Sequence, residues 1–247
     1  MNSTGSHSFT RLAISLIFVF ALAVRAEDTG WQSKAALGLN AAAGNSESIL
    51  VNVELSTART VDENSYKCSL LLARGEADKT VSEENGKLSA RYDRAVSEMA
   101  YLYLRGDVDF DTIANIDYRI IAGPGAGYSL IKNETHELSI EAGLSYRTER
   151  ITTDVAVTDD AVVIRLAQSY ARKLSDNAKL WQTIEFMPDS DNLDAFLLNA
   201  EVGIEATVND NLSLRVTAQD RYNSAPPEET KENDISVKAS LVYNIGK

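Results

Sequence analysis

The sequence predicts an all-β fold, an antiparallel up-and-down transmembrane β-barrel of about 12 strands. Three observations support this prediction. An export signal precedes a chain without a long apolar helix, long segments alternate apolar and polar residues, and aromatic residues gather at two levels along these segments. In lipid, only helices and closed barrels satisfy all their backbone polar groups, so an exported chain of alternating strands fits a barrel.

The first 26 residues are predicted to be a cleaved secretory signal. Arg11 supplies the positive start, residues 12–24 (LAISLIFVFALAV) form an apolar core, and Val24-Arg25-Ala26 fits a cleavage site. The apolar core is too short to span a bilayer comfortably. We therefore expect residues 27–247 to form one outer-membrane barrel domain with both termini on the periplasmic side.

The clearest alternation lies in residues 117–149, which are expected to form two strands joined by a polar turn at 132–135. A period of two is the signature of a strand, because successive side chains point to opposite faces. One face is apolar and the other is rich in charge and glycine, which is the pattern of a strand between lipid and a polar lumen. In the second strand the apolar face consists of Leu138, Ile140, Ala142, Leu144 and Tyr146.

Further segments of this kind fill the chain after the signal. The expected strands are 30–42, 48–58, 65–75, 86–95, 99–111, 115–131, 136–150, 161–173, 178–187, 194–208, 211–223 and 233–245. The connections at 152–160 and 224–232 are long, whereas those at 175–177 and 209–210 are short. Outer-membrane barrels have short periplasmic turns and longer outer loops, so this order fits two periplasmic termini.

With the apolar face turned outward, aromatic residues are expected to form two girdles at the membrane interfaces. The ring expected at the periplasmic end consists of Trp31, Tyr66, Tyr92, Tyr128, Tyr170 and Tyr243. The ring expected at the outer end consists of Phe110, Tyr118, Tyr146, Phe186, Phe196 and Tyr222.

The inward face carries cations and anions in nearly equal number, although the whole chain has a formal net charge of −12. A selective pore usually lines its constriction with one sign of charge, whereas a mixture favours ion pairs that bridge strands. Barrels of this size lie between filled eight-stranded barrels and open porins. We therefore expect a narrow or plugged lumen with a charge network formed by Arg91, Asp93, Arg105, Asp107, Asp117, Arg119, Glu141, Arg147, Glu201, Glu205 and Arg215.

Catalysis is not expected. His136 is the one histidine after the signal, and its neighbours do not form a nucleophile–base site, which needs hydrogen-bonded partners. The segment 123–127 (GPGAG) leads into more strand and not into a helix, so it does not match a phosphate loop. Its inward glycines are expected to make room in a crowded lumen or to bend the strand.

No cofactor and no metal site are expected. The segment 107–111 (DVDFD) resembles the start of a calcium loop but lacks the glycine and the bidentate glutamate that such a loop needs. Asp189, Asp191 and Asp194 form a second acidic group in an expected loop, and a solvated run of charge explains both groups better.

The chain resembles a bacterial family of salt-induced outer-membrane proteins, catalogued as domain of unknown function 481. In the central hairpin the resemblance rests on Gly123-Pro124-Gly125-Ala126-Gly127-Tyr128 and on Leu138, Glu141, Gly143, Tyr146 and Glu149. At the edges it rests on Trp31, Gly38, Gly44, Asn45, Asp234 and residues 241–243. The resemblance implies an outer-membrane barrel without an agreed biochemical activity and with a role under envelope stress.

The expected function is therefore that of a structural or stress-related outer-membrane barrel with a narrow, charged lumen. Two alternatives stay open: a small porin-like diffusion pore, and a soluble periplasmic β-barrel that binds a ligand with its apolar face inside. The expected partners are outer-membrane lipid and the barrel assembly machinery. The acidic composition argues against nucleic acid as a partner.

Overall fold

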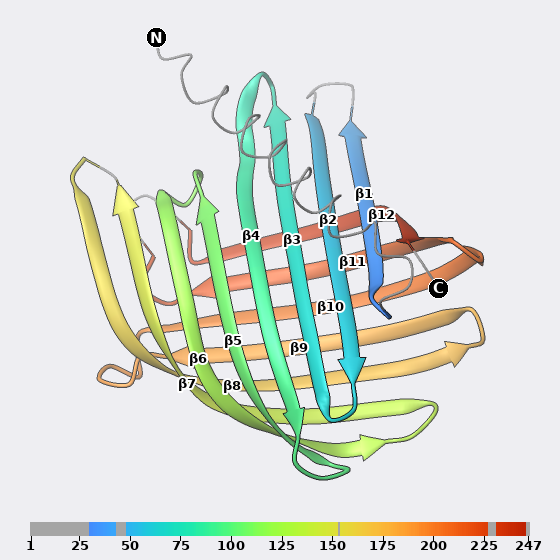
Figure 1. Cartoon of the computed structure of the whole chain (residues 1–247). Coiled ribbons are helices and arrows are strands. Elements are labelled where there is room, and N and C mark those ends of the chain that lie inside the picture. Colours follow the sequence, from blue (N-terminus) through green and yellow to red (C-terminus); the bar gives the residue numbers. More distant parts are fainter. Residues whose placement is uncertain (1–29, 43–47, 153, 227–230, 246–247) are drawn as a thin grey trace.

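The computed structural model describes residues 30–42, 48–152, 154–226 and 231–245, which form a closed antiparallel barrel (Figure 1). Each strand pairs with its neighbours in sequence, which confirms the predicted up-and-down order. The predicted signal at residues 1–26 lies outside the described residues. The strands are β1 (Gln32–Ala42), β2 (Ser48–Val61), β3 (Asn64–Ala77), β4 (Thr80–Ala95), β5 (Ala100–Asp111), β6 (Ile116–Lys132), β7 (His136–Thr152), β8 (Ala156–Ser175), β9 (Ala178–Pro188), β10 (Phe196–Asn209), β11 (Leu212–Asn223) and β12 (Asn233–Ile245).

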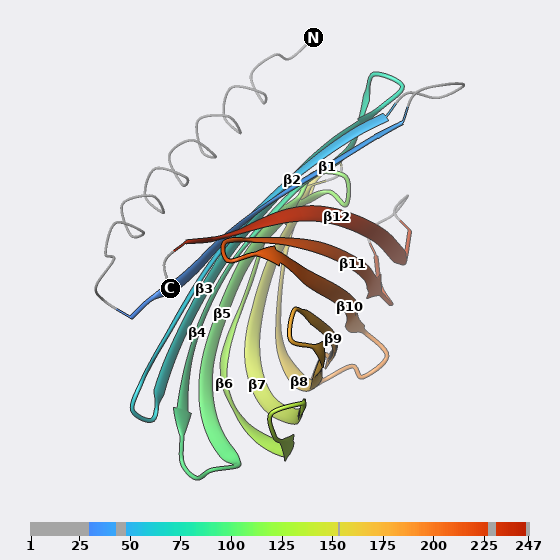
Figure 2. The ribbon, with the colours of Figure 1, turned by 90° about the vertical axis from the view of Figure 1, so that its right-hand side faces the viewer.

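The barrel closes where β1 pairs with β12. Their register runs from Ser33 opposite Ile245 to Gly38 opposite Ser240. Figure 2 shows the end of the sheet, β12, brought back beside β1. In lipid, each unpaired backbone group at an open edge costs several kcal/mol, so this pairing removes the main obstacle to a membrane-spanning sheet.

The alternation in sequence sets which residues face outward. Large apolar side chains lie exposed on the outside of the barrel, among them Leu37, Leu104, Leu144 and Val237. Charged side chains such as Arg165, which is 5 % exposed, are turned inward. The alternative of a barrel with an apolar, ligand-binding interior is therefore wrong. None of the described segments is a helix long and apolar enough to cross a membrane.

The connections define two ends of the barrel. At the termini end, where β1 begins and β12 ends, the strands are joined by residues 62–63, 96–99, 133–135, 176–177 and 210–211. At the opposite loop end they are joined by residues 43–47, 78–79, 112–115, 153–155, 189–195 and 224–232. The two longest connections, 189–195 and 224–232, lie at the loop end, and the second of them was predicted to be long.

Two predicted connections are wrong in length. The loop expected at 152–160 is short, because β7 and β8 continue to pair from Thr148 opposite Asp160 to Thr152 opposite Ala156. The fourth strand begins at Thr80 and not at residue 86, because Asp78 and Lys79 adopt positive φ values of 50° and 65° and close a tight hairpin.

A small apolar cluster faces the interior towards the loop end. It consists of Ile121 on β6, Val163 on β8, Met187 on β9 and Leu197 on β10, all buried. These side chains occupy part of the space between facing walls, so the interior is not lined by polar residues throughout.

Candidate functional site

The lumen is the candidate site. It encloses a cavity of about 1140 Å³ that is lined by residues from every strand. The lining includes Gln32 and Lys34 near the termini end and Ile113 and Asp234 at the loop end. The cavity therefore reaches from one end of the barrel towards the other.

Two tyrosine rings pack over the inner face of the wall formed by β5, β6 and β7. Tyr101 lies opposite Gly127, and Tyr103 lies opposite Gly125. A Cβ atom added to either glycine would overlap the ring of its partner, and one added to Gly143 would lie 2.6 Å from the Tyr103 hydroxyl. The inward glycines thus make room, as predicted, and the space is filled by Tyr101 and Tyr103.

Glu141 on β7 is the centre of an ion-pair cluster at this wall. Its carboxylate accepts hydrogen bonds from Arg91 on β4 at 2.6 Å and from Arg165 on β8 at 2.7 Å. The hydroxyl of Tyr101 donates a third at 2.7 Å. Arg165 also donates to the Tyr103 hydroxyl at 2.9 Å, and the Arg91 guanidinium lies 4.5 Å from the centre of the Tyr103 ring. One carboxylate therefore joins strands that are not neighbours in the sheet.

The cluster extends through further carboxylates. Arg91 lies 2.7 Å from Asp93, and Arg105 lies 2.7 Å from Asp107 and 2.9 Å from Glu185. Arg165 also pairs with Glu185. Because Glu185 lies on β9, the pairs span the lumen from β4 to β9.

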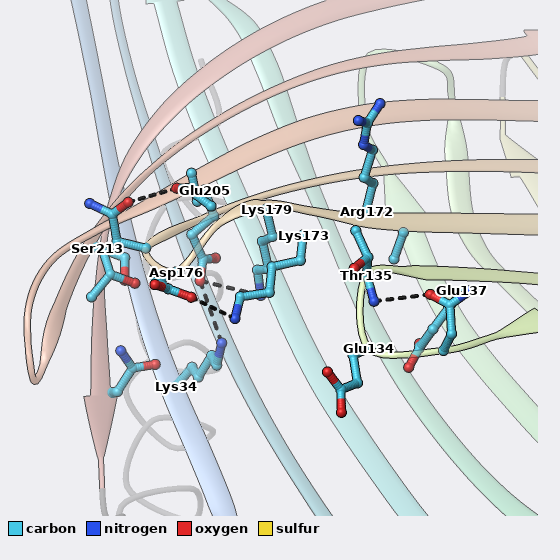
Figure 3. A pocket seen from close by; sticks show the side chains of 17 residues that line it. Lys34, Glu134, Thr135, Glu137, Arg172, Lys173, Asp176, Lys179, Glu205 and Ser213 are labelled. Atoms are coloured by element: carbon cyan, nitrogen blue, oxygen red, sulfur yellow. Dashed lines mark hydrogen bonds and ion pairs between the residues drawn. The ribbon is translucent and has the colours of Figure 1, made fainter.

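A second cluster surrounds Glu205 at the termini end (Figure 3). Arg215 lies 2.8 Å from Glu205 and 2.8 Å from Glu54, while Lys34 and Lys179 approach Glu205 to 3.5 and 3.4 Å. Next to it, the indole nitrogen of Trp181 donates to Glu201 at 2.8 Å. Glu201 is thus held by Trp181, and Glu205 by three cations.

Two arginines lie towards the loop end. Arg119 pairs with Glu149 and lies 3.9 Å from Asp109. Arg147 pairs with Asp159 at 2.8 Å and with Asp189 at 2.9 Å. The partners of Arg147 were not predicted: Asp159 fell in an expected loop, and Asp189 follows β9 in a connection without strand periodicity.

Asp117 does not join the interior network, so its placement there is a wrong prediction. Its carboxylate lies 3.3 Å from Arg150 and accepts a hydrogen bond from Thr152 at 2.7 Å. The side chains of Asp117 and Arg150 are 48 and 47 % exposed. The register of β6 with β7 shifts between Ile116 and Tyr118, which breaks the alternation on which the prediction relied.

Most of the predicted girdle residues lie towards one end of their strand, whereas Tyr146 lies near the middle of β7. Towards the termini end, the rings of Tyr66 and Tyr92 lie 5.3 Å apart. Towards the loop end, Phe196 lies 5.1 Å from Phe186 and 5.5 Å from Tyr222. The remaining predicted residues lie in or next to strands: Trp31 before β1, Phe110 in β5, Tyr118 and Tyr128 in β6, Tyr146 in β7, Tyr170 in β8 and Tyr243 in β12.

The structure also gives the contacts of His136 and of the two acidic segments. The Nδ1 atom of His136 lies 2.9 Å from the Tyr170 hydroxyl at the termini end. Asp107 and Asp109 face arginines, and Asp189 pairs with Arg147. Within the described ranges, no group of three or more histidine, cysteine, aspartate or glutamate side chains could hold a metal ion.

Comparisons with known proteins agree with this fold. The structure resembles the translocator domain of the autotransporter NalP from Neisseria meningitidis, with a TM-score of 0.54, 14 % identity, and coverage of 96 % of this chain and 97 % of that one. It also resembles the NanC porin, with a TM-score of 0.52, 5 % identity, and coverage of 87 and 99 %. At these identities the likeness shows the outer-membrane barrel fold alone.

The sequence itself has relatives. It is 27 % identical over 148 residues to the uncharacterized protein YdiY of Escherichia coli (strain K12), a match that covers 59 % of this chain and 56 % of that protein. The profile of the family described as "Protein of unknown function, DUF481" matches residues 35–245, which include all of the barrel except the first residues of β1. The chain therefore belongs to the DUF481 family.

Proposed function

We propose that this protein resides in the bacterial outer membrane and acts as a narrow conduit for small hydrophilic solutes. The observation that carries the proposal is the cavity of about 1140 Å³, whose lining reaches from Lys34 near the termini end to Asp234 at the loop end. An apolar exterior and a polar interior are the arrangement of a barrel that conducts water-soluble molecules across lipid.

Side chains on the inner wall of the barrel narrow the cavity. Tyr101, Tyr103 and the arginines that pair with Glu141 occupy the wall formed by β4–β8, and the apolar cluster around Val163 occupies the wall towards the loop end. Side chains fill the interior of small barrels, and open channels belong to larger ones. We therefore propose passage for ions and small polar solutes and exclusion of larger ones.

The location and the conduction are tested separately. Detergent extraction after cell fractionation tests the location, and a shift in SDS mobility on boiling tests for a folded barrel. For conduction, purified protein in planar bilayers is expected to give small, steady current steps, and liposomes that contain it are expected to admit small sugars and exclude large ones. A folded barrel that passes neither ions nor any sugar would contradict the conduit.

A structural role under envelope stress is the second candidate. It is favoured by the ion pairs of Glu141 and Glu185, which tie β4, β5, β7, β8 and β9 together across the lumen. The stress role itself rests on the family resemblance. A deletion strain that grows poorly in high salt and is rescued by a non-conducting variant would favour this candidate over the conduit.

A further inference from the structure

Three cations face one another in a direct cross-strand row inside the lumen. Lys67 on β3 lies opposite Arg91 on β4, and Arg91 lies opposite Arg105 on β5. All three line the lumen cavity, together with Lys87. Like charges at opposed positions are destabilising, so neighbouring groups must offset the row.

The offsetting carboxylates lie behind the cations. The side chains of Asp93 and Asp107 are 11 and 5 % exposed, whereas those of Lys67 and Lys87 are 55 and 41 % exposed. Lys67 lies 3.2 Å from Asp93, and Lys87 lies 3.8 Å from Asp107. The charges nearly balance in number, but a solute inside the lumen meets the ammonium groups first.

The cluster at the termini end repeats this layout independently. Lys34 and Lys179 are 35 and 51 % exposed, while the Glu205 that they share is 6 % exposed. Both lysines point at Glu205 (Figure 3), and all three residues line a cavity of about 420 Å³. Glu134, Glu137 and Asp176 also line this mouth. They are exposed and lie on or next to the turns, outside the strand-borne cluster.

The loop end of the lumen has a different balance. Its cavity lining includes Glu83, Asp109, Asp111, Glu232 and Asp234, against Arg119, Arg221 and Lys231. Exposed positive charge is therefore concentrated in the middle of the lumen and towards the termini end. Pores that select by charge place one sign at the narrow part, and the row of Lys67, Arg91 and Arg105 lies beside the wall that carries Tyr101 and Tyr103.

We propose that the lumen selects small anions, carboxylates or phosphates, at the cationic row and the Glu205 cluster. This inference rests on the proposed conduit. The guanidinium groups of Arg91 and Arg105 already face two carboxylates each, whereas Lys67 and Lys87 have one ion pair each in the described structure and exposed ammonium groups. An ammonium group acts as a point charge with three donors, so the lumen selects by sign of charge and not by the shape of the anion.

The test is the reversal potential of single channels in a potassium chloride gradient. The unaltered protein is expected to be anion-selective, and added acetate or phosphate is expected to reduce the chloride current. Lys67→Glu combined with Lys87→Glu is expected to lower the chloride-to-potassium permeability ratio several-fold. Lys132→Glu is the matched control, because Lys132 is exposed at the end of β6 and lines neither cavity.

The outcomes separate the two proposals. A steady conductance that is cation-selective or unselective in the unaltered protein contradicts the anion site and leaves the conduit standing. The absence of any conductance contradicts both. If the double glutamate variant does not fold, as judged by SDS mobility without boiling, Lys67→Gln and Lys87→Gln serve instead, and an unchanged permeability ratio in these variants also contradicts the anion site.

Discussion

Tyr103 on β5 lies directly opposite Gly125 on β6, and its ring occupies the space that a side chain at residue 125 would need. Gly125→Ala is therefore expected to displace the ring and to destabilise the barrel by about 1–3 kcal/mol, the usual cost of overpacking. Urea titration of the folded fraction in lipid measures the effect. Gly106→Ala is the control, because its Cβ would lie 3.9 Å from the nearest atom. Equal effects of the two changes would contradict the packing described.

Removal of the Tyr103 ring should widen the conduit. Tyr103 is 4 % exposed and is held by Arg165 and Arg91. Tyr103→Ala is expected to increase single-channel conductance and to admit larger sugars in liposome swelling. Leu104→Ala, which changes the outward neighbour, should leave both unchanged. A conductance unaltered by Tyr103→Ala would place the narrow part elsewhere.

Loss of the Glu141 carboxylate should reduce the stability of the folded barrel. Glu141→Gln removes the charge that neutralises Arg91 and Arg165. Breaking a buried pair by changing one partner destabilises by about 3–5 kcal/mol, and water in the lumen should place the cost at the lower end. Glu137→Gln, at an exposed position of the same strand, should change stability little. Heat-induced loss of the compact SDS band compares the two variants, and similar midpoints would count against the cluster.

The two faces of β10 predict a difference between substitutions at Val202 and at Asn199. Val202 is 46 % exposed on the apolar outside, while Asn199 lines the lumen. Val202→Arg is expected to destabilise the inserted barrel by about 2–4 kcal/mol, because arginine then faces hydrocarbon. Asn199→Arg should cost less. The folded fraction in lipid vesicles gives the comparison, and a larger cost at residue 199 would invert the assigned faces.

Barrel closure can be tested by cross-linking. Leu37 lies opposite Leu241 in the register of β1 with β12. Opposed residues in antiparallel strands have Cα atoms about 4.5–5.5 Å apart, within reach of a disulfide. In a Cys68→Ser background, Leu37→Cys with Leu241→Cys should form a disulfide on oxidation. Leu37→Cys with Val237→Cys should not, because Val237 lies farther along β12. Cross-linking of the second pair alone would indicate another register.

Most of the fold could be predicted from the sequence, because alternation with a period of two is a local property of each strand. It predicted every strand and the inward glycines of the segment 123–127, but not that two tyrosines lie opposite Gly125 and Gly127. It failed where pairing depends on the partner strand: β8 extends through Val157 and Asp159 because β7 stands beside it. It also failed at Asp117, where a shift in register breaks the alternation.

The interior charges were predicted as residues but not as an arrangement. The alternation along the strands places Lys67 and Asp93 on the same, inward face. It does not show that the lysine side chain stays exposed while the carboxylate becomes buried. That difference depends on side-chain length and on which strands face each other across the lumen. Likewise, no sequence pattern indicated that Asp189, beyond the end of β9, would pair with Arg147.

The unequal exposure of Lys67 and Asp93 also makes the lumen responsive to ionic strength. Screening acts on charges that are open to electrolyte, and the Debye length falls from about 8 Å at physiological salt to about 3 Å at 1 M. The exposed ammonium groups should lose their long-range attraction as salt rises, whereas the buried pairs around Glu141, which is 9 % exposed, are shielded from mobile ions. High salt should therefore abolish the preference for anions while the barrel stays intact.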